Sequence, residues 1–145
     1  MGNLVTQNHF IIAAQQQRVW KLLGSAIFQS LPLEEMNNIN QTTFYAIFRL
    51  RLGFISIPLN LKGKFVDIID PSSLSSLIWV KRGIIQLGIK VTFTLKEAIE
   101  GKTEVICSAT EEGKDSIIRH MLRRWERSFA EKVFNSVRVQ LEKLC

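Results

Sequence analysis

The sequence has few of the residues that build disulfides, metal centres or acid–base sites. Only two cysteines and two histidines occur among its 145 residues, against nine phenylalanines and three tryptophans. Cys107 lies within an apolar segment and Cys145 is the last residue, and neither belongs to a metal-ligand spacing. We therefore expect two free thiols, no metal and no cofactor.

Long hydrophobic runs are also absent. The longest uncharged stretches are too polar or too short to cross a bilayer, and the first ten residues, MGNLVTQNHF, contain no basic segment followed by an apolar one. Apolar residues make up 46% and charged residues 22%, which is a globular composition, and no repeat or linker appears. We expect one cytoplasmic domain over residues 1–145. Gly2 and Thr6 fit the loose myristoylation pattern, which often occurs by chance.

Acidic residues are fewer than basic ones, giving a net charge of +6. The excess is concentrated between Lys114 and Arg138, a segment that contains seven basic and three acidic residues. Such a face attracts phosphate on nucleic acid or anionic lipid. The alternative, which we favour, is a solvated helix face whose arginines pair with Glu126 and Glu131 at spacings of three and four.

The apolar residues from Thr42 onward recur with a period of two, which predicts antiparallel strands wet on one side. The first two strands are joined by a turn at Gly53 and Phe54, and Pro58 predicts an edge or a bulge in the second. Further strands are expected over residues 65–69, 76–80, 84–96 and 103–110. Before them, the pattern predicts a first strand over 10–14, a helix over 15–23 ended by Gly24, a short helical turn over 26–30 and a loop over 31–41.

After Gly113 the period becomes 3.6, and Asp115 or Ser116 can cap a helix of about 28 residues that ends at Lys143. One long amphipathic helix must then cover the apolar face of the sheet. Its predicted apolar stripe consists of Ile118, Met121, Leu122, Trp125, Phe129, Val133, Val137, Leu141 and Leu144.

This order of elements resembles the helix-grip superfamily of START domains, polyketide cyclases and plant pathogenesis-related allergens, and within it most closely the CoxG group of carbon monoxide dehydrogenase proteins. The segments that carry the resemblance are FIIAAQQQRVWKLL (10–23), YAIFRLRLGFISIPLNLKG (45–63), VTFTLKEAIEGKTEVICSA (91–109) and the helix that begins near Ser116. The resemblance implies an α+β helix-grip fold. In that fold, a curved antiparallel sheet of six to seven strands wraps around a long C-terminal helix, with two short helices after the first strand.

A sheet covered by one helix often encloses a hollow, so we expect a ligand site between the two. The residues predicted to line it are Phe48, Leu50, Leu52, Ile57, Leu59, Leu61, Trp79, Ile89, Val91, Phe93, Val105, Cys107, Met121, Trp125 and Phe129. The alternative for each is an ordinary core residue in a closed interior.

Two classes of function follow. The resemblance implies non-enzymatic carriage of a hydrophobic molecule such as a lipid, quinone or isoprenoid. The basic face of the last helix could then contact the inner membrane face or an oxidoreductase partner, as in the CoxG group. The alternative is a cyclase or aromatase, which needs an acid or base inside the cavity.

The residues favour the carrier over the enzyme. His9 and His120 are expected in solvent, and Cys107 has no visible base partner. Asp67 is the only carboxylate expected to point inward, on the condition that no bulge follows Gly63. We therefore assign no catalytic residue. Nucleic acid is not an expected partner, because most aromatic residues fall on apolar faces and leave no stacking platform.

Overall fold

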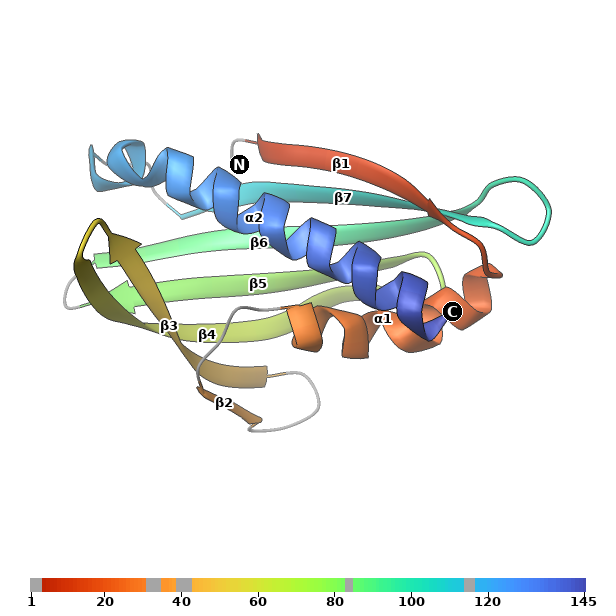
Figure 1. The fold of residues 1–145 in the computed structure, drawn as a ribbon, viewed down its shortest axis with the longest axis horizontal. Helices are drawn as coiled ribbons and strands as arrows, with labels where there is room; N and C mark the ends of the chain where they lie inside the picture. The colour runs from red at the N-terminus through yellow and green to blue at the C-terminus, as the bar shows by residue number, and fades with distance from the viewer. Residues whose placement is uncertain (1–3, 31–34, 39–42, 83–84, 114–116) are drawn as a thin grey trace.

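The computed structural model describes residues 4–30, 35–38, 43–82, 85–113 and 117–145 (Figure 1). One strand and one helix come first, followed by six strands and a long helix. The strands are β1 (Leu4–Ile12), β2 (Glu35–Asn38), β3 (Thr43–Leu52), β4 (Ile55–Ile69), β5 (Ser73–Arg82), β6 (Ile85–Glu97) and β7 (Thr103–Glu112). The helices are α1 (Gln16–Ser30) and α2 (Ile117–Leu144).

The strands form one seven-stranded antiparallel sheet in the order β1-β7-β6-β5-β4-β3-β2. Helix α2 runs diagonally across one face of this sheet, and α1 lies beside its C-terminal end (Figure 1). The main contacts of α2 are with α1 and β1, and a smaller one is with β6. The molecule thus has two layers, and the predicted arrangement of an antiparallel sheet with a long C-terminal helix is confirmed.

The core lies between these two layers, and β7 shows how the sequence produces it. Every second residue of β7 is buried and the others are half-buried, so Val105, Cys107 and Ala109 face the helices. Phe93 of β6 meets Phe134 of α2 edge to face, with 6.0 Å between ring centroids. No helix in the described segments is long and apolar enough to cross a bilayer.

Helix α1 is one continuous helix, so the prediction of two short helices is wrong. Gly24 was expected to end the first of them, because glycine costs about 1 kcal/mol relative to alanine inside a helix. The residues that hold the helix together across this position are fully or almost fully buried: Val19, Leu23, Ala26 and Ile27. Their burial against the sheet and α2 outweighs the local cost at Gly24.

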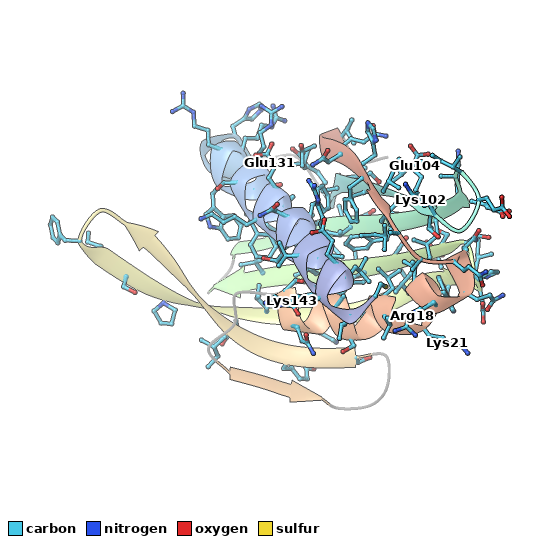
Figure 2. The ribbon with its side chains drawn as sticks, turned by 45° about the vertical axis from the view of Figure 1, so that its right-hand side comes forward. Arg18, Lys21, Lys102, Glu104, Glu131 and Lys143 are labelled. Carbon is cyan, nitrogen blue, oxygen red and sulfur yellow. The ribbon has the colours of Figure 1, made fainter. Side chains whose placement is uncertain are left out.

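The two helices also join at their ends. Arg18 of α1 donates a hydrogen bond of 3.0 Å to the carbonyl oxygen of Leu144 at the end of α2. Figure 2 shows Arg18 and Lys143 at this same end of the molecule, while the β3–β4 hairpin extends away from the helices. The helices therefore support one end of the sheet much more than the other.

Several strand boundaries differ from the predicted ones. β1 begins at Leu4, six residues before the predicted start at Phe10, and β2 forms within the predicted loop over 31–41. β2 contains little apolar surface, and it is a strand because it pairs with β3 along its whole length. Pairing with a neighbour, rather than its own composition, makes this segment extended.

β4 continues as one strand through Gly63, where the pattern predicted a break. Gly63 pairs with Phe44 on one side and Ile78 on the other and is buried, so hydrogen bonds on both sides keep it extended. The irregularity comes later, between Val66 and Ile69. Within it, Asp67 has a φ of 50°, in the left-handed region.

Pro58 pairs with Arg49 of β3, and β4 pairs with β3 from Ile55 onward. The described pairing of β4 with β5 begins at Asn60, opposite Lys81. This register places position 83 opposite Pro58, and position 83 lies outside the described residues. The expectation of an edge or a bulge at Pro58 therefore stays a prediction.

Candidate functional site

The predicted ligand site lies in the layer between the sheet and α2, and the structure buries many of its residues there. The predicted residues that are buried in this layer are Leu61, Ile89, Val91, Phe93, Val105, Cys107 and Phe129. Phe93, Val105 and Cys107 have no solvent exposure at all. The middle of the layer is thus a packed core.

Trp79 does not belong to this layer, and its predicted place in the lining is wrong. Its neighbours Ile78 and Val80 are buried toward the helices, and successive side chains of a strand point to opposite faces. Trp79 therefore projects from the outer face, where it pairs with Lys62 and Gly88. The sequence LIWV at 77–80 is apolar at every position, so its period could not show which residues face inward.

At the far end of the predicted lining, the structure describes the backbone and leaves the side chains outside the description. These side chains are Phe48, Leu50, Leu52, Ile57, Leu59 and Met121. The backbone register pairs Phe48 with Leu59 and Leu50 with Ile57, in phase with the pairing of Ala46 with Leu61. Their role in the lining stays a prediction. Beside this end, Trp125 is half-buried and stacks on Phe129, with ring centroids 5.4 Å apart.

Two carboxylates that sequence reasoning placed elsewhere or overlooked are buried in the layer. Glu126 of α2 has no exposed surface, and Glu111 of β7 is 4% exposed. Glu111 continues the inward alternation of β7, and Glu126 precedes Phe129 by three residues on the buried stripe of α2. Those spacings were the available signal. Glu126 was expected on the solvated face of the helix, and its complete burial shows that this placement is wrong.

Asp67 was the carboxylate expected to point inward, and it does not. Its side chain is 62% exposed and forms an ion pair of 2.6 Å with Lys90 on the outer face. Regular alternation along β4 would place Asp67 on the inner face, and the register shift after Val66 moves its side chain to the outer face. A bulge after Gly63 was the condition under which the inward prediction would fail.

The Cys107 thiol and the two histidines are not placed for catalysis in the layer. Burial raises the pKa of the Cys107 thiol from its ordinary value of 9.0 to about 12, so the thiol stays protonated at neutral pH. The side chain of His9 is 71% exposed, 3.7 Å from Glu104, and His120 is also exposed. The expectation that both histidines lie in solvent is confirmed.

Ser76 adds a polar group to the sheet wall of the layer. It lies on the inner face of β5, paired with Val91 of β6, and is 2% exposed. Within the described part of the chain, its hydroxyl oxygen has no hydrogen-bond partner. A hydroxyl in this position can bind a polar atom of a ligand.

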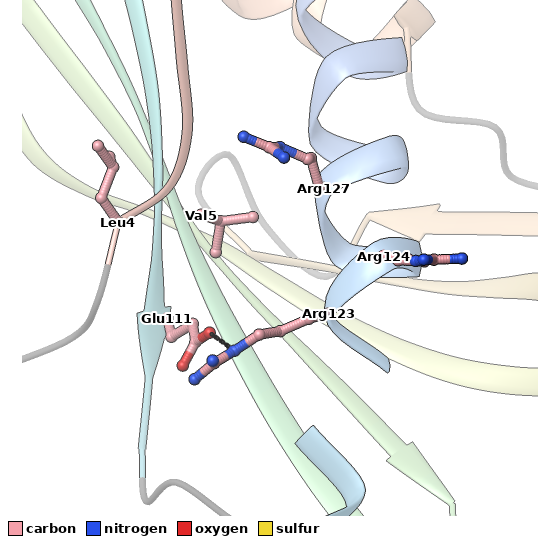
Figure 3. Close-up of a pocket in the computed structure, with 6 residues that line it drawn as sticks. All are labelled: Leu4, Val5, Glu111, Arg123, Arg124 and Arg127. Carbon is pink, nitrogen blue, oxygen red and sulfur yellow. Dashed lines mark hydrogen bonds and ion pairs between the residues drawn. The ribbon is translucent and has the colours of Figure 1, made fainter. Parts of the chain in front are cut away.

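A pocket of about 370 Å³ opens where β1, the end of β7 and α2 meet (Figure 3). Its lining residues are Leu4, Val5, Glu111, Arg123, Arg124 and Arg127. Arg123 and Glu111 form an ion pair of 3.3 Å across the pocket, and Arg127 pairs with Glu131 at 3.7 Å. Three arginines beside two aliphatic side chains give the pocket a positive rim and an apolar wall.

Comparison with known proteins shows the fold. A conserved protein from Geobacillus kaustophilus is similar to this chain with a TM-score of 0.72 and 13% identity, over 94% of each chain. An aromatase/cyclase from a Streptomyces species has a TM-score of 0.61 and 10% identity, over 96% of this chain and 92% of its own. A protein from Mesorhizobium loti has a TM-score of 0.60 and 15% identity, over 96% of each chain.

The chain has a helix-grip-like fold. No family model matches its sequence, and no curated protein is similar to it. The structural similarities come with identities of 10–15%, so they establish the architecture and leave the chemistry to the residues of this chain. Those residues offer an apolar layer, two buried carboxylates, the Ser76 hydroxyl without a described partner and an arginine-lined pocket at the margin.

Proposed function

We propose that this protein binds a hydrophobic small molecule between the sheet and α2 without transforming it. The observation that carries the proposal is the apolar inner wall of β4, β5 and β6, continuous with the arginine-lined pocket through Glu111. The residues of that wall nearest the pocket end are Leu61, Ile78, Val80, Leu87 and Ile89. Ile89 pairs directly with Glu111, so the apolar wall and the pocket are adjacent.

The arginines of the pocket favour a ligand with an acidic group at one end. Arg124 and Arg127 line the pocket and are exposed, so an incoming anion need not displace a buried charge. The hydrocarbon part of such a ligand would lie along Val5 and the inner wall. Hiding roughly 300 Å² of apolar surface would contribute about 7 kcal/mol, which corresponds to a Kd of about 10 μM before ordering costs are subtracted.

The test is native mass spectrometry of protein purified without detergent. We expect a co-purified apolar mass in the wild type and its loss in Ile89→Trp, which fills the inner wall. Thr92→Trp is the matched control, because Thr92 is three residues along the same strand and is not part of the buried inner wall. Loss of the mass in both variants would indicate misfolding, which circular dichroism would reveal. A clean spectrum of the wild type after incubation with fatty acid would contradict the proposal.

Arg127→Gln tests the acidic group of the ligand. Arg127 and Arg138 each pair with a glutamate four residues later on α2, but only Arg127 lines the pocket. We expect Arg127→Gln to weaken binding of a fatty acid and Arg138→Gln to leave it unchanged. Equal effects of the two substitutions would remove the pocket from the proposal.

A second candidate function is a cyclase-like enzyme, and the buried carboxyl of Glu126 is the observation that favours it. A carboxyl enclosed on the inner stripe of α2 could act as a general acid on a ligand in the layer. The aromatase/cyclase similarity supports the architecture for such a reaction. Turnover of a polyketide-like substrate that Glu126→Gln abolishes, with the fold retained, would reverse our ranking.

The finer assignment to the CoxG group is also part of the proposal. In that group the carrier works beside the membrane and an oxidoreductase. The support in this chain is the exposed basic side of α2, which includes Arg124, Arg127 and Lys132. Sedimentation with anionic vesicles at low salt tests the membrane contact, and absence of binding there would remove it.

A further inference from the structure

A row of aromatic and basic side chains crosses the outer face of the sheet, on the side away from α2. Tyr45 of β3 pairs with Lys62 of β4, Lys62 pairs with Trp79 of β5, and Trp79 pairs with Gly88 of β6. Directly paired residues on neighbouring strands project side by side, about 4.8 Å apart. The row therefore places a cation between two aromatic rings.

Trp79 is held in this row by the glycine beside it. A Cβ atom added to Gly88 would lie 2.6 Å from Cζ3 of the indole, so the ring rests directly on the backbone of β6. A Cβ added to Gly113 would lie 3.5 Å from the same ring. Because the indole lies over these two backbone positions, its place on the outer face is fixed before any ligand arrives.

Lys62 and its neighbour Lys64 form no ion pair with a described carboxylate. The Nζ atom of Lys62 lies 5.8 Å from the centroid of the Tyr45 ring, and Lys64 is the next outward residue along β4. No carboxylate in the described part of the chain lies within ion-pair distance of either lysine. Lys90, on the same face, contrasts with them because Asp67 neutralises it at 2.6 Å.

These side chains line a pocket of about 560 Å³, within the size range of small-molecule sites. Its lining residues are Tyr45, Asn60, Leu61, Lys62, Lys64, Leu77 and Trp79. Aromatic rings bind another planar ring by stacking, and unpaired lysines bind an anion. A pure hydrocarbon would form no ion pair with the lysines, and a bare phosphate would not stack on the rings.

We propose that this outer-face pocket binds a planar aromatic anion of the base-plus-phosphate type, as a free nucleotide or as part of a single-stranded nucleic acid. The base stacks on Trp79 and the phosphate lies against Lys62 and Lys64. Stacking on one aromatic side chain contributes about tenfold or more to the affinity. Nucleic acid was not an expected partner because most aromatic residues fall on apolar faces, whereas Trp79 faces outward.

Quenching of tryptophan fluorescence tests the pocket directly. The probes are AMP, an eight-nucleotide single-stranded DNA and inorganic phosphate. We expect saturable quenching by AMP or the oligonucleotide and none by phosphate alone. Trp79→Phe should remove most of the signal, which assigns it to this residue rather than to Trp20 or Trp125.

The lysines provide the matched comparison. Lys62→Gln should weaken binding about tenfold, whereas Lys90→Gln should leave it unchanged because Asp67 already neutralises Lys90. Lys62 is exposed, so its substitution should not disturb folding. Equal losses in the two variants would overturn the proposal, because the effect would then reflect net charge alone.

The two sources of the ligand are separated by the probes. An oligonucleotide that binds much more tightly than AMP, with a steep dependence on salt, identifies single-stranded nucleic acid. Equal affinities identify a free nucleotide. No saturable quenching by either up to about 10 mM overturns the proposal. So does quenching by anionic lipid vesicles alone, which would make this face a membrane contact.

Discussion

At the scale of single residues, the contact between Trp79 and Gly88 determines the shape of the outer face. The indole occupies the space that any side chain at position 88 would need. We expect Gly88→Ala to displace the ring and to lower the free energy of unfolding by about 1–3 kcal/mol, the usual cost of overpacking. Urea unfolding and the emission maximum of tryptophan measure the two effects.

A double-mutant cycle isolates this contact. In a Trp79→Ala background the clash is gone, so adding Gly88→Ala should cost nothing or stabilise the strand. The same cost of Gly88→Ala in both backgrounds would show that the indole is not the obstacle.

Cys107 makes the stability of the fold depend on pH in the alkaline range. Its pKa is about 12 in the folded protein and ordinarily 9.0, so between these values the unfolded chain loses the proton and the folded chain keeps it. Folding then becomes less favourable as pH rises, by about 1.4 kcal/mol per pH unit from this thiol. Below about pH 9 both states keep the proton and the effect vanishes.

Chemical unfolding at several pH values between about 8 and 11 measures this slope. Cys107→Ala is the control, because it removes this thiol and leaves every other ionisable group of the chain in place. The wild type should lose stability more steeply than the variant above about pH 9. Parallel curves for the two proteins would show that Cys107 ionises equally in the folded and unfolded states.

Sequence reasoning succeeded at residues whose strands alternate cleanly. Phe93 and Cys107 lie in such strands and are buried as predicted. Trp79 lies in a run of four apolar residues, where alternation gives no phase. The predicted exposure of Glu126 was wrong for a different reason. Charged residues usually lie in solvent, and only the packing of α2 in the folded protein shows that this one is enclosed.

At the scale of elements, α1 depends on tertiary packing more than on its own sequence. Gly24 lies inside the helix, and an added Cβ there would have no heavy atom within 4 Å. We therefore expect Gly24→Ala to raise the free energy of unfolding by about 1 kcal/mol, by lowering the entropy of the unfolded chain and favouring the helix. Urea unfolding measures the gain.

Gly101→Ala is the contrasting control for this prediction. Gly101 also has open space around its missing Cβ, but its φ of 76° lies in the left-handed region. Alanine there should destabilise the turn between β6 and β7. Should Gly24→Ala fail to stabilise the protein, α1 would have to be strained at that position in a way its contacts do not show.

The elements differ in how well the sequence predicts them, for physical reasons. The predicted end of α2 at Lys143 lies one residue from the observed end at Leu144, because a long amphipathic helix has a strong period of its own. β2 was missed because its sequence, EMNN, has three polar residues among four and becomes a strand only when β3 is beside it. The lining side chains of β3 stay predictions at this scale, since the backbone register alone is described.

At the scale of the whole molecule, the helices support the sheet unevenly. Helix α2 packs on α1, β1 and β6, while the β3–β4 hairpin extends away from the helices (Figure 2). At the tip of that hairpin Phe54 is 99% exposed and Ile55 is 52% exposed. Stability within one domain follows the density of buried contacts, so it should fall from β6 and β7 toward this tip.

Amide hydrogen exchange measures this gradient strand by strand. Amides in the middle of β6 and β7 should exchange only through global unfolding, because these strands are paired on both sides and buried against the helices. Amides near the tip of the hairpin should exchange at least about 100-fold faster after correction for intrinsic rates. A ligand bound in the layer between sheet and α2 should slow exchange at the tip more than in β7, because it adds contacts where the helices supply few. Uniform protection across all seven strands would mean that the hairpin is stabilised without the helices, and the ligand site would then lie elsewhere.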